Sequence, residues 1–166
     1  IKDQKTSDTY LRDTINVLKA VAKSPYVVGS DFIGEEINDI SDLQPAIEQI
    51  VKYVREEDPE FTVRIHAGEN DSLRDNVRKS ILCVKEALAD GQEMPKCRIG
   101  HGLYSENLDS KAGKELMQLM TETGVVVEFQ LTSNVRLNNL TEITRHPIKK
   151  YLENGIKCVQ GTDGCG

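Results

Sequence analysis

Several features are scarce or absent in this sequence of 166 residues. It has no tryptophan, only 5% aromatic residues and only three histidines. It also has no apolar run close to the ~18 uninterrupted residues that a membrane-spanning helix requires. Its first residues, IKDQKTSD, lack the basic and then apolar order of a signal peptide. We therefore expect a soluble, cytoplasmic protein without a membrane partner.

An excess of basic residues is also missing. The chain has 27 acidic and 21 basic residues, which gives a net charge of -6. Because the charges are mixed along the whole length, no basic stripe is available to neutralise a phosphate backbone. We therefore expect no binding of nucleic acid by charge.

The four cysteines, at positions 83, 97, 158 and 165, have no CxxC spacing. Pairs of that spacing are typical of redox and metal-binding motifs. Disulfides are rare in the cytoplasm, where thiols are kept reduced. We therefore predict reduced thiols with no role in the chemistry.

Helical and strand patterns alternate along the chain. Apolar residues recur three to four positions apart in the predicted helices, whereas the predicted strands are short, apolar and rich in β-branched residues. Ser41 and Gln44 form a capping-box pattern at the start of the second helix, and Gly91 and Gly124 are expected to end the third and fourth. The predicted helices are 7–23, 41–58, 72–91, 111–124 and 147–154, and the predicted strands are 26–32, 61–67, 97–100, 125–131 and 156–161.

This alternation predicts an α/β fold with parallel strands, either an open doubly wound sheet or a (β/α)8 barrel. The GxGxxG and GxxxxGK[ST] motifs of nucleotide-binding open sheets are absent. Polar residues instead follow nearly every strand, and a barrel would gather all of them at one mouth. They are Asp31, His66 with Glu69, His101, Ser133 and Asp163.

A complete barrel takes about 250 residues, so five β/α units form little more than half of one. The chain begins without methionine and stops after an apolar strand. We therefore expect residues 1–166 to be a single-domain fragment of a TIM barrel, from its C-terminal half and incomplete at both ends. The missing N-terminal part of the barrel is then an obligatory partner.

Two histidines and one aspartate stand out among these strand-end residues. Imidazole and carboxylate groups from His66, His101 and Asp163 are suitable ligands for zinc or a similar divalent ion. Any one of them alone is more often a structural turn residue. Glu69 follows His66 across a glycine turn, where partial burial could raise the pKa of its carboxyl group and let it donate a proton.

Five segments carry a resemblance to a known family. They are HAGE at 66–69, RIGHG at 98–102, LTSNVRL at 131–137, HP at 146–147 and TD at 162–163. In this order and at these separations they resemble the adenosine deaminase family of zinc hydrolases. The resemblance implies a (β/α)8 barrel in which a zinc-activated water attacks C6 of a purine and ammonia leaves.

The resemblance also implies roles for individual residues. His66 would be a zinc ligand, and Asp163 would bind the same ion and help to position the water. Glu69 would protonate N1 of the purine. His101 would orient or deprotonate the attacking water. Gly34, in the segment GSDFIGEE, would let the backbone approach the purine.

Two departures from the family pattern leave alternatives open. The His-x-His motif that supplies two further zinc ligands is absent, and Gly164 stands where the family usually has a second, purine-binding aspartate. The leading prediction is a zinc-dependent deaminase of adenosine or a related adenine nucleoside. The alternatives are a non-catalytic scaffold or purine-binding module, and a deaminase of AMP or another aminopurine. A homo-oligomer is compatible with either class.

Four further residues receive a structural interpretation. His146 precedes Pro147 at a helix start and is expected to cap or pack. Glu35 and Glu36 are expected to lie on a solvated surface. Asp31 is expected near the mouth of the barrel, where it could brace a loop by hydrogen bonds.

Overall fold

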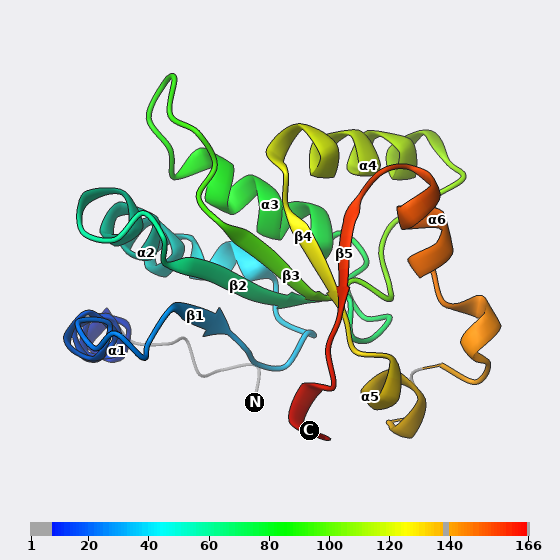
Figure 1. The fold of residues 1–166 in the computed structure, drawn as a ribbon, viewed down its shortest axis with the longest axis horizontal. Helices are drawn as coiled ribbons and strands as arrows, with labels where there is room; N and C mark the ends of the chain where they lie inside the picture. The colour runs from blue at the N-terminus through cyan, green and yellow to red at the C-terminus, as the bar shows by residue number, and fades with distance from the viewer. Residues whose placement is uncertain (1–7, 138–139, 166) are drawn as a thin grey trace.

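The computed structural model describes residues 8–137 and 140–165 of the chain. Within these ranges five strands form one parallel sheet, and their order in the sheet is their order in the chain. Figure 1 shows the strands fanning across the molecule. They are β1 (Gly29–Phe32), β2 (Thr62–Ala67), β3 (Cys97–His101), β4 (Val126–Phe129) and β5 (Lys157–Gln160).

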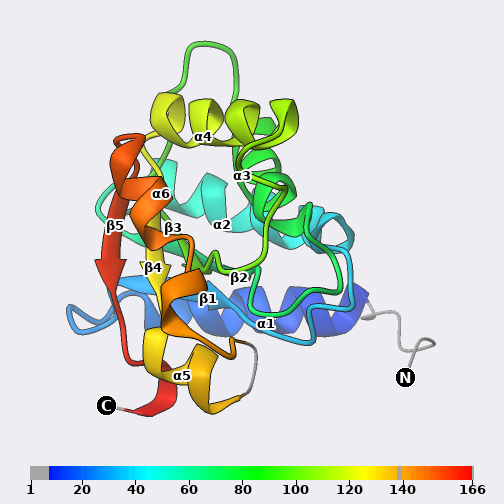
Figure 2. The same cartoon turned by 90° about the vertical axis from the view of Figure 1, so that its right-hand side faces the viewer.

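Helices connect the strands, as the alternating pattern predicts. Figures 1 and 2 show α2, α3 and α4 side by side on one face of the sheet. The helices are α1 (Asp8–Val21), α2 (Gln44–Glu56), α3 (Asn76–Glu86), α4 (Lys111–Thr123), α5 (Leu131–Arg136) and α6 (Ile148–Glu153). Short 3-10 turns lie at η1 (Ile40–Leu43), η2 (Ile143–Arg145) and η3 (Asp163–Cys165). The predicted α/β architecture of five β/α units is confirmed.

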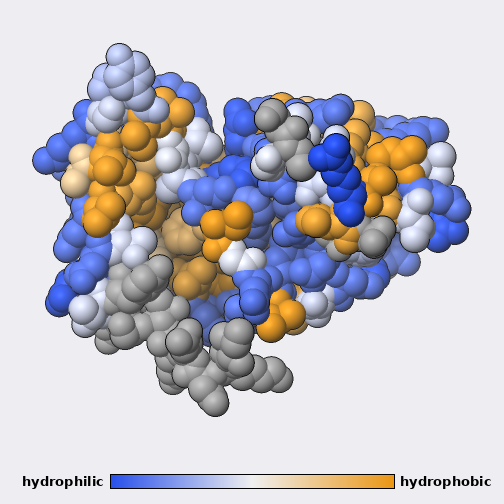
Figure 3. All heavy atoms as spheres, turned by 90° about the horizontal axis from the view of Figure 1, so that it is seen from below, coloured by the Kyte–Doolittle hydropathy of each residue, from blue (hydrophilic) through white to orange (hydrophobic). Residues whose placement is uncertain are grey.

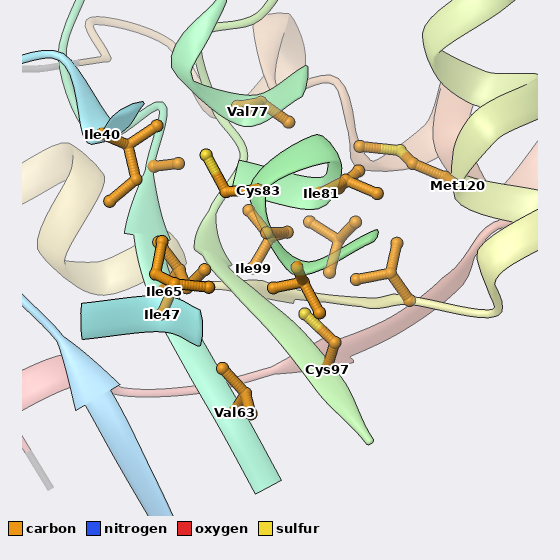
Figure 4. Close-up of a cluster of buried hydrophobic side chains, with 14 of the residues drawn as sticks. Ile40, Ile47, Val63, Ile65, Val77, Ile81, Cys83, Cys97, Ile99 and Met120 are labelled. Atoms are coloured by element: carbon orange, nitrogen blue, oxygen red, sulfur yellow. The ribbon is translucent and has the colours of Figure 1, made fainter. Parts of the chain in front are cut away.

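The hydrophobic core lies between the sheet and the helices α2, α3 and α4 (Figure 4). Side chains alternate between the two faces of a strand, so Val63 and Ile65 of β2 face these helices. Arg64 and His66 therefore face the opposite side of the sheet. The core residues that Figure 4 labels are Ile40, Ile47, Val63, Ile65, Val77, Ile81, Cys83, Cys97, Ile99 and Met120.

Several of the predicted helix boundaries are wrong. Ser41 does not cap α2: it lies inside η1, and the side chain of Asp39 accepts a hydrogen bond from the Ser41 backbone N–H. The α3 helix ends at Glu86, before Gly91, which has a left-handed φ of 76° in the following loop. The prediction for Gly124 is confirmed, because it caps α4 with a φ of 65°. α5 was not predicted as a helix.

The first strand is shorter and more exposed than predicted. β1 begins at Gly29, and the exposed fractions of Tyr26 and Val28 are 91% and 69%. Among the described residues β1 pairs only with β2, so its other edge has no neighbour to bury it. The helix before it ends at Val21 instead of position 23, and its predicted first residue, Ser7, lies outside the described residues. Figure 3 shows apolar residues exposed on the side of the molecule away from α2, α3 and α4.

Two further predictions concern the whole chain. None of the described helices is both long enough and apolar enough to cross a membrane. Three of the four cysteines, Cys83, Cys97 and Cys158, are free thiols in the described part of the chain, as predicted. Burial raises the pKa of the Cys97 thiol to about 12, which makes it inert.

Candidate metal centre and active site

Three strand-end residues converge at one edge of the sheet, where the parallel strands end. His66 lies near the end of β2, His101 ends β3, and Asp163 begins η3 just after β5. One ligand atom from each lies within 4.8 Å of the others, and Nε2 of His66 is 4.0 Å from Oδ1 of Asp163. The predicted convergence is therefore confirmed, and the three side chains could hold a metal ion.

The His66 ring is oriented by Asp31. Its Nδ1 lies 2.9 Å from Oδ1 of Asp31, so Nδ1–H donates to the carboxylate and Nε2 is left to bind a metal. Arg64 also pairs with Asp31, and its Nη1 lies 3.2 and 3.3 Å from the two ring nitrogens of His66. Partial burial raises the pKa of the Asp31 carboxyl, but the hydrogen bond from His66 and the charges of His66 and Arg64 outweigh it and lower that pKa. Asp31 therefore lies at the site, as predicted, and its carboxylate braces the His66 ring.

His101 is completely buried and faces the site with one nitrogen. Its Nδ1 is 3.0 Å from Oδ1 of Asn134, whereas its Nε2 has no hydrogen-bond partner among the described residues. That Nε2 lies 3.9 Å from Oε1 of Glu69. The His101 backbone has a φ of 72°, a left-handed conformation that is uncommon for residues other than glycine.

Glu69 is positioned by the glycine turn that precedes it and by Glu36. Gly68 has a φ of 78°, and a Cβ at this position would lie 2.4 Å from the carbonyl oxygen of Tyr104. The backbone N–H of Glu69 donates to both carboxylate oxygens of Glu36, at 3.0 and 2.9 Å. Glu36 is only 6% exposed, so the prediction that it lies on a solvated surface is wrong. Glu35 is exposed, as predicted.

Asp163 is held by groups from the segment after β4. Its Oδ2 accepts a hydrogen bond of 2.8 Å from Ser133 Oγ, and its backbone N–H donates to Gln130 Oε1 at 2.7 Å. Its backbone is in the left-handed region, with a φ of 56°. The side chain of Gln130 fills the space beside Gly161, where a Cβ would lie 2.5 Å from Gln130 Oε1.

An ion-paired layer lies on the same side of the sheet as the site. Arg64 donates to both carboxylate oxygens of Glu128, and Gln130 Nε2 donates to Oε1 of Glu128 at 2.7 Å. Arg64, Glu128, Gln130 and Asn134 were not predicted as residues of the site. Strand periodicity was the available signal, because it places Arg64 on the same face as His66.

Gly34 is not part of this cluster. It lies in the loop after β1, is exposed, and would have nothing within 4 Å of an added Cβ. The space beside it is therefore open to a molecule that approaches the backbone.

Comparison with known proteins identifies the family. A sequence model described as adenosine deaminase matches residues 4–165 of this chain. The chain belongs to the adenosine deaminase family. It is 35% identical over 140 residues to the adenosine deaminase of Plasmodium gallinaceum, covering 84% of this chain and 33% of that protein. It is also 35% identical over 138 residues to the adenosine deaminase of Clostridium kluyveri, covering 82% of this chain and 33% of that protein.

Solved structures with the same fold are also those of deaminases. The N6-methyl-AMP deaminase of Arabidopsis thaliana matches with a TM-score of 0.65 at 19% identity, over 92% of this chain and 39% of that one. The adenine deaminase of Arthrobacter aurescens matches with a TM-score of 0.67 at 18% identity, over 94% of this chain and 42% of that one. The fold is therefore that of part of a deaminase TIM barrel. The chain spans about a third of the length of the curated relatives that it matches.

Proposed function

We propose that this chain supplies the main catalytic groups of a zinc-dependent enzyme that converts adenosine, or a related adenine nucleoside, to the inosine product and ammonia. The convergence of His66, His101 and Asp163 within 4.8 Å carries this proposal. These three side chains come from different strands, so no local turn requirement explains why they meet. Membership of the adenosine deaminase family supports the same reaction.

The donor set fits a zinc ion. Nε2 of His66 and the carboxylate of Asp163 would hold it, and both are ligand types that zinc prefers. When bound, zinc makes water acidic enough to supply hydroxide near neutral pH. Two further ligands would come from the missing N-terminal part of the barrel. That part is proposed because the chain spans only about a third of its relatives.

The remaining groups of the site have proposed roles in moving protons and placing the substrate. Glu69, 24% exposed and 3.9 Å from His101, would protonate the ring nitrogen next to the carbon under attack. His101 would orient or deprotonate the attacking water. Asp163 would bind the metal and position that water. Gly34 would let the purine lie against the backbone of the loop after β1.

A second candidate is a deaminase of AMP or another aminopurine. Gly164 favours it, because an exposed glycine with open space around it stands where the family usually has a purine-binding aspartate. The same glycine and the absent His-x-His motif also favour a non-catalytic purine-binding module. The expected cytoplasmic location is likewise a proposal, and the free thiols support it.

The test uses the complete barrel, meaning these 166 residues together with the remaining β/α units. Conversion of adenosine to inosine is measured for the unmodified protein and for Glu69→Gln, which keeps the shape of the side chain and removes the acid. Asp71→Asn is the matched control, since Asp71 is an exposed carboxylate in the same loop. The zinc content of all three proteins is measured in parallel.

We expect turnover that is lost in Glu69→Gln and retained in Asp71→Asn, with one zinc bound per site in each protein. Zinc without turnover of adenosine would shift the proposal to AMP or another aminopurine. Absence of both zinc and turnover would overturn the enzyme proposal in favour of the non-catalytic module.

A further inference from the structure

A row of three buried polar side chains runs away from the metal centre. Nδ1 of His101 lies 3.0 Å from Oδ1 of Asn134, and Nδ2 of Asn134 lies 3.3 Å from Nε2 of His146. His101 and Asn134 are completely buried and His146 is 5% exposed. Nδ1 of His146 accepts a hydrogen bond from the N–H of Ile148, the first residue of α6, and its ring packs edge-on against Phe129, with 4.8 Å between the ring centroids. These two contacts confirm its predicted capping and packing role. Capping does not explain why its second nitrogen faces Asn134.

The backbone determines which nitrogen of His146 carries the proton. The N–H of Ile148 donates to Nδ1 of His146 at 3.2 Å, so this nitrogen accepts with its lone pair and carries no proton. A neutral imidazole carries one proton, which must then lie on Nε2. Burial lowers the pKa of His146 to about 4, so the ring is neutral at physiological pH. His146 therefore presents an N–H donor to Asn134.

This donor dictates the orientation of the Asn134 amide. With Nδ2 toward His146, two donors face each other inside the core, which leaves both unsatisfied. The oxygen and nitrogen of an amide are interchangeable in shape and are assigned from the hydrogen-bond network. Turning the amide places its oxygen toward His146 and its NH2 group toward His101. Nδ1 of His101 then accepts a hydrogen bond and cannot carry the proton.

We propose that His146 and Asn134 are positioning residues that hold the single proton of neutral His101 on Nε2, the nitrogen that faces the reaction site. His101 is then a hydrogen-bond donor to the attacking water. It is neither the base that deprotonates this water nor a metal ligand, since both roles need a lone pair on Nε2. The inference rests on the proposed function and chooses between two roles for His101, to orient the water or to deprotonate it.

The proton position is read directly by NMR of the complete barrel with 15N-labelled histidine. The two ring nitrogens of a neutral histidine give different 15N signals according to which of them is protonated. His101→Gln assigns the signals. We expect Nε2 of His101 to be protonated. In Asn134→Asp, whose carboxylate accepts from both rings, we expect the proton of His101 to move to Nδ1.

A pair of His146 variants separates hydrogen bonding from packing. His146→Gln places an amide N–H near the former Nε2 and should retain the tautomer of His101. His146→Leu fills the space without a donor, so the Asn134 amide can turn and both tautomers should be populated. A proton on Nδ1 of His101 in the unmodified protein would overturn the inference. A His101 spectrum unchanged by Asn134→Asp or by His146→Leu would overturn it as well.

Kinetics provide a second readout. Loss of a positioned donor to developing charge lowers kcat by about a hundredfold, so Asn134→Asp should lower kcat and leave KM unchanged. Tyr151→Phe is the matched control, because Tyr151 of α6 is buried beside Phe129 of β4 and its hydroxyl lies 3.1 Å from Oγ of Ser105, away from the link between His101 and His146. If no adenine nucleoside is turned over while the tautomer reverses as expected, the proposed function fails and the positioning role stands.

Discussion

The Glu36 carboxylate accepts hydrogen bonds from the backbone N–H of Glu69 through both of its oxygens, at 3.0 and 2.9 Å. The loop after β1 thereby fixes the turn after β2. Glu36→Gln replaces one of the two acceptor oxygens with an NH2 group, which weakens this attachment. We expect kcat/KM for adenosine to fall by about tenfold, as for loss of one hydrogen bond to a charged group.

The measurement is steady-state kinetics of the complete barrel. Glu35→Gln is the control, since the neighbouring carboxylate is exposed and should change little. Equal kinetics for the two variants would show that Glu36 does not position Glu69.

Gly68 and Gly91 provide a matched pair for the HAGE turn. Both have a left-handed backbone, with φ of 78° and 76°, but only Gly68 lacks room for a Cβ. Gly91→Ala should cost about 1 kcal/mol of unfolding free energy from backbone conformation alone. Gly68→Ala adds a collision with the backbone at Tyr104 and should cost about 3 kcal/mol. Urea unfolding of both variants of the complete barrel measures these two costs. Equal losses of unfolding free energy in Gly68→Ala and Gly91→Ala would contradict the prediction.

His146 makes stability depend on pH. Its pKa is lowered to about 4 in the folded state, below the ordinary value of 6.5. The unfolded chain therefore takes up this proton first as the pH falls. The contribution of His146 is complete above about pH 6.5 and is lost as the pH falls toward 4, by about 1–3 kcal/mol. The unfolding free energies of the unmodified complete barrel and of its His146→Gln variant, measured against pH, should diverge between about pH 6.5 and 4. Parallel curves of unfolding free energy against pH would show that His146 does not have the lowered pKa.

Asp31 should control how tightly the metal is held. Its carboxylate orients His66, and loss of such a partner commonly weakens metal binding by about 10- to 100-fold. We therefore expect Asp31→Asn to lose zinc to a chelator at correspondingly lower chelator concentrations. Asp42→Asn, at an exposed position, is the control. Identical zinc retention in the two variants would exclude this role.

The 166 residues alone should not form a stable monomer. β1 and β5 each pair with one strand only in the described chain, and such open edges promote aggregation. We expect no cooperative unfolding transition and a hydrodynamic size larger than that of a monomer. A cooperative transition with a monomeric size would show that the remaining barrel units are not needed for folding.

Strand positions and the convergence of the site could be predicted from the sequence. Parallel β/α units put every strand end on the same side, so His66, His101 and Asp163 had to lie close together once the strands were recognised. The family resemblance added their proposed roles.

The supporting residues could not be predicted in this way. Glu36 is buried because its carboxylate meets the backbone N–H of Glu69, a contact that no local pattern encodes. The predicted start of α2 at Ser41 failed because Asp39 caps a separate 3-10 turn, η1, which precedes α2. The link from His101 through Asn134 to His146 depends on the path of α5 and η2, which returns the chain to the site.

The order of the strands has a consequence for how this molecule is made. Each strand pairs with the strand that precedes it in the chain. During synthesis each new β/α unit of the described chain therefore finds its partner strand already present. The sheet can grow one unit at a time as the chain leaves the ribosome, and the metal centre is completed only when β5 and the residues after it have been added.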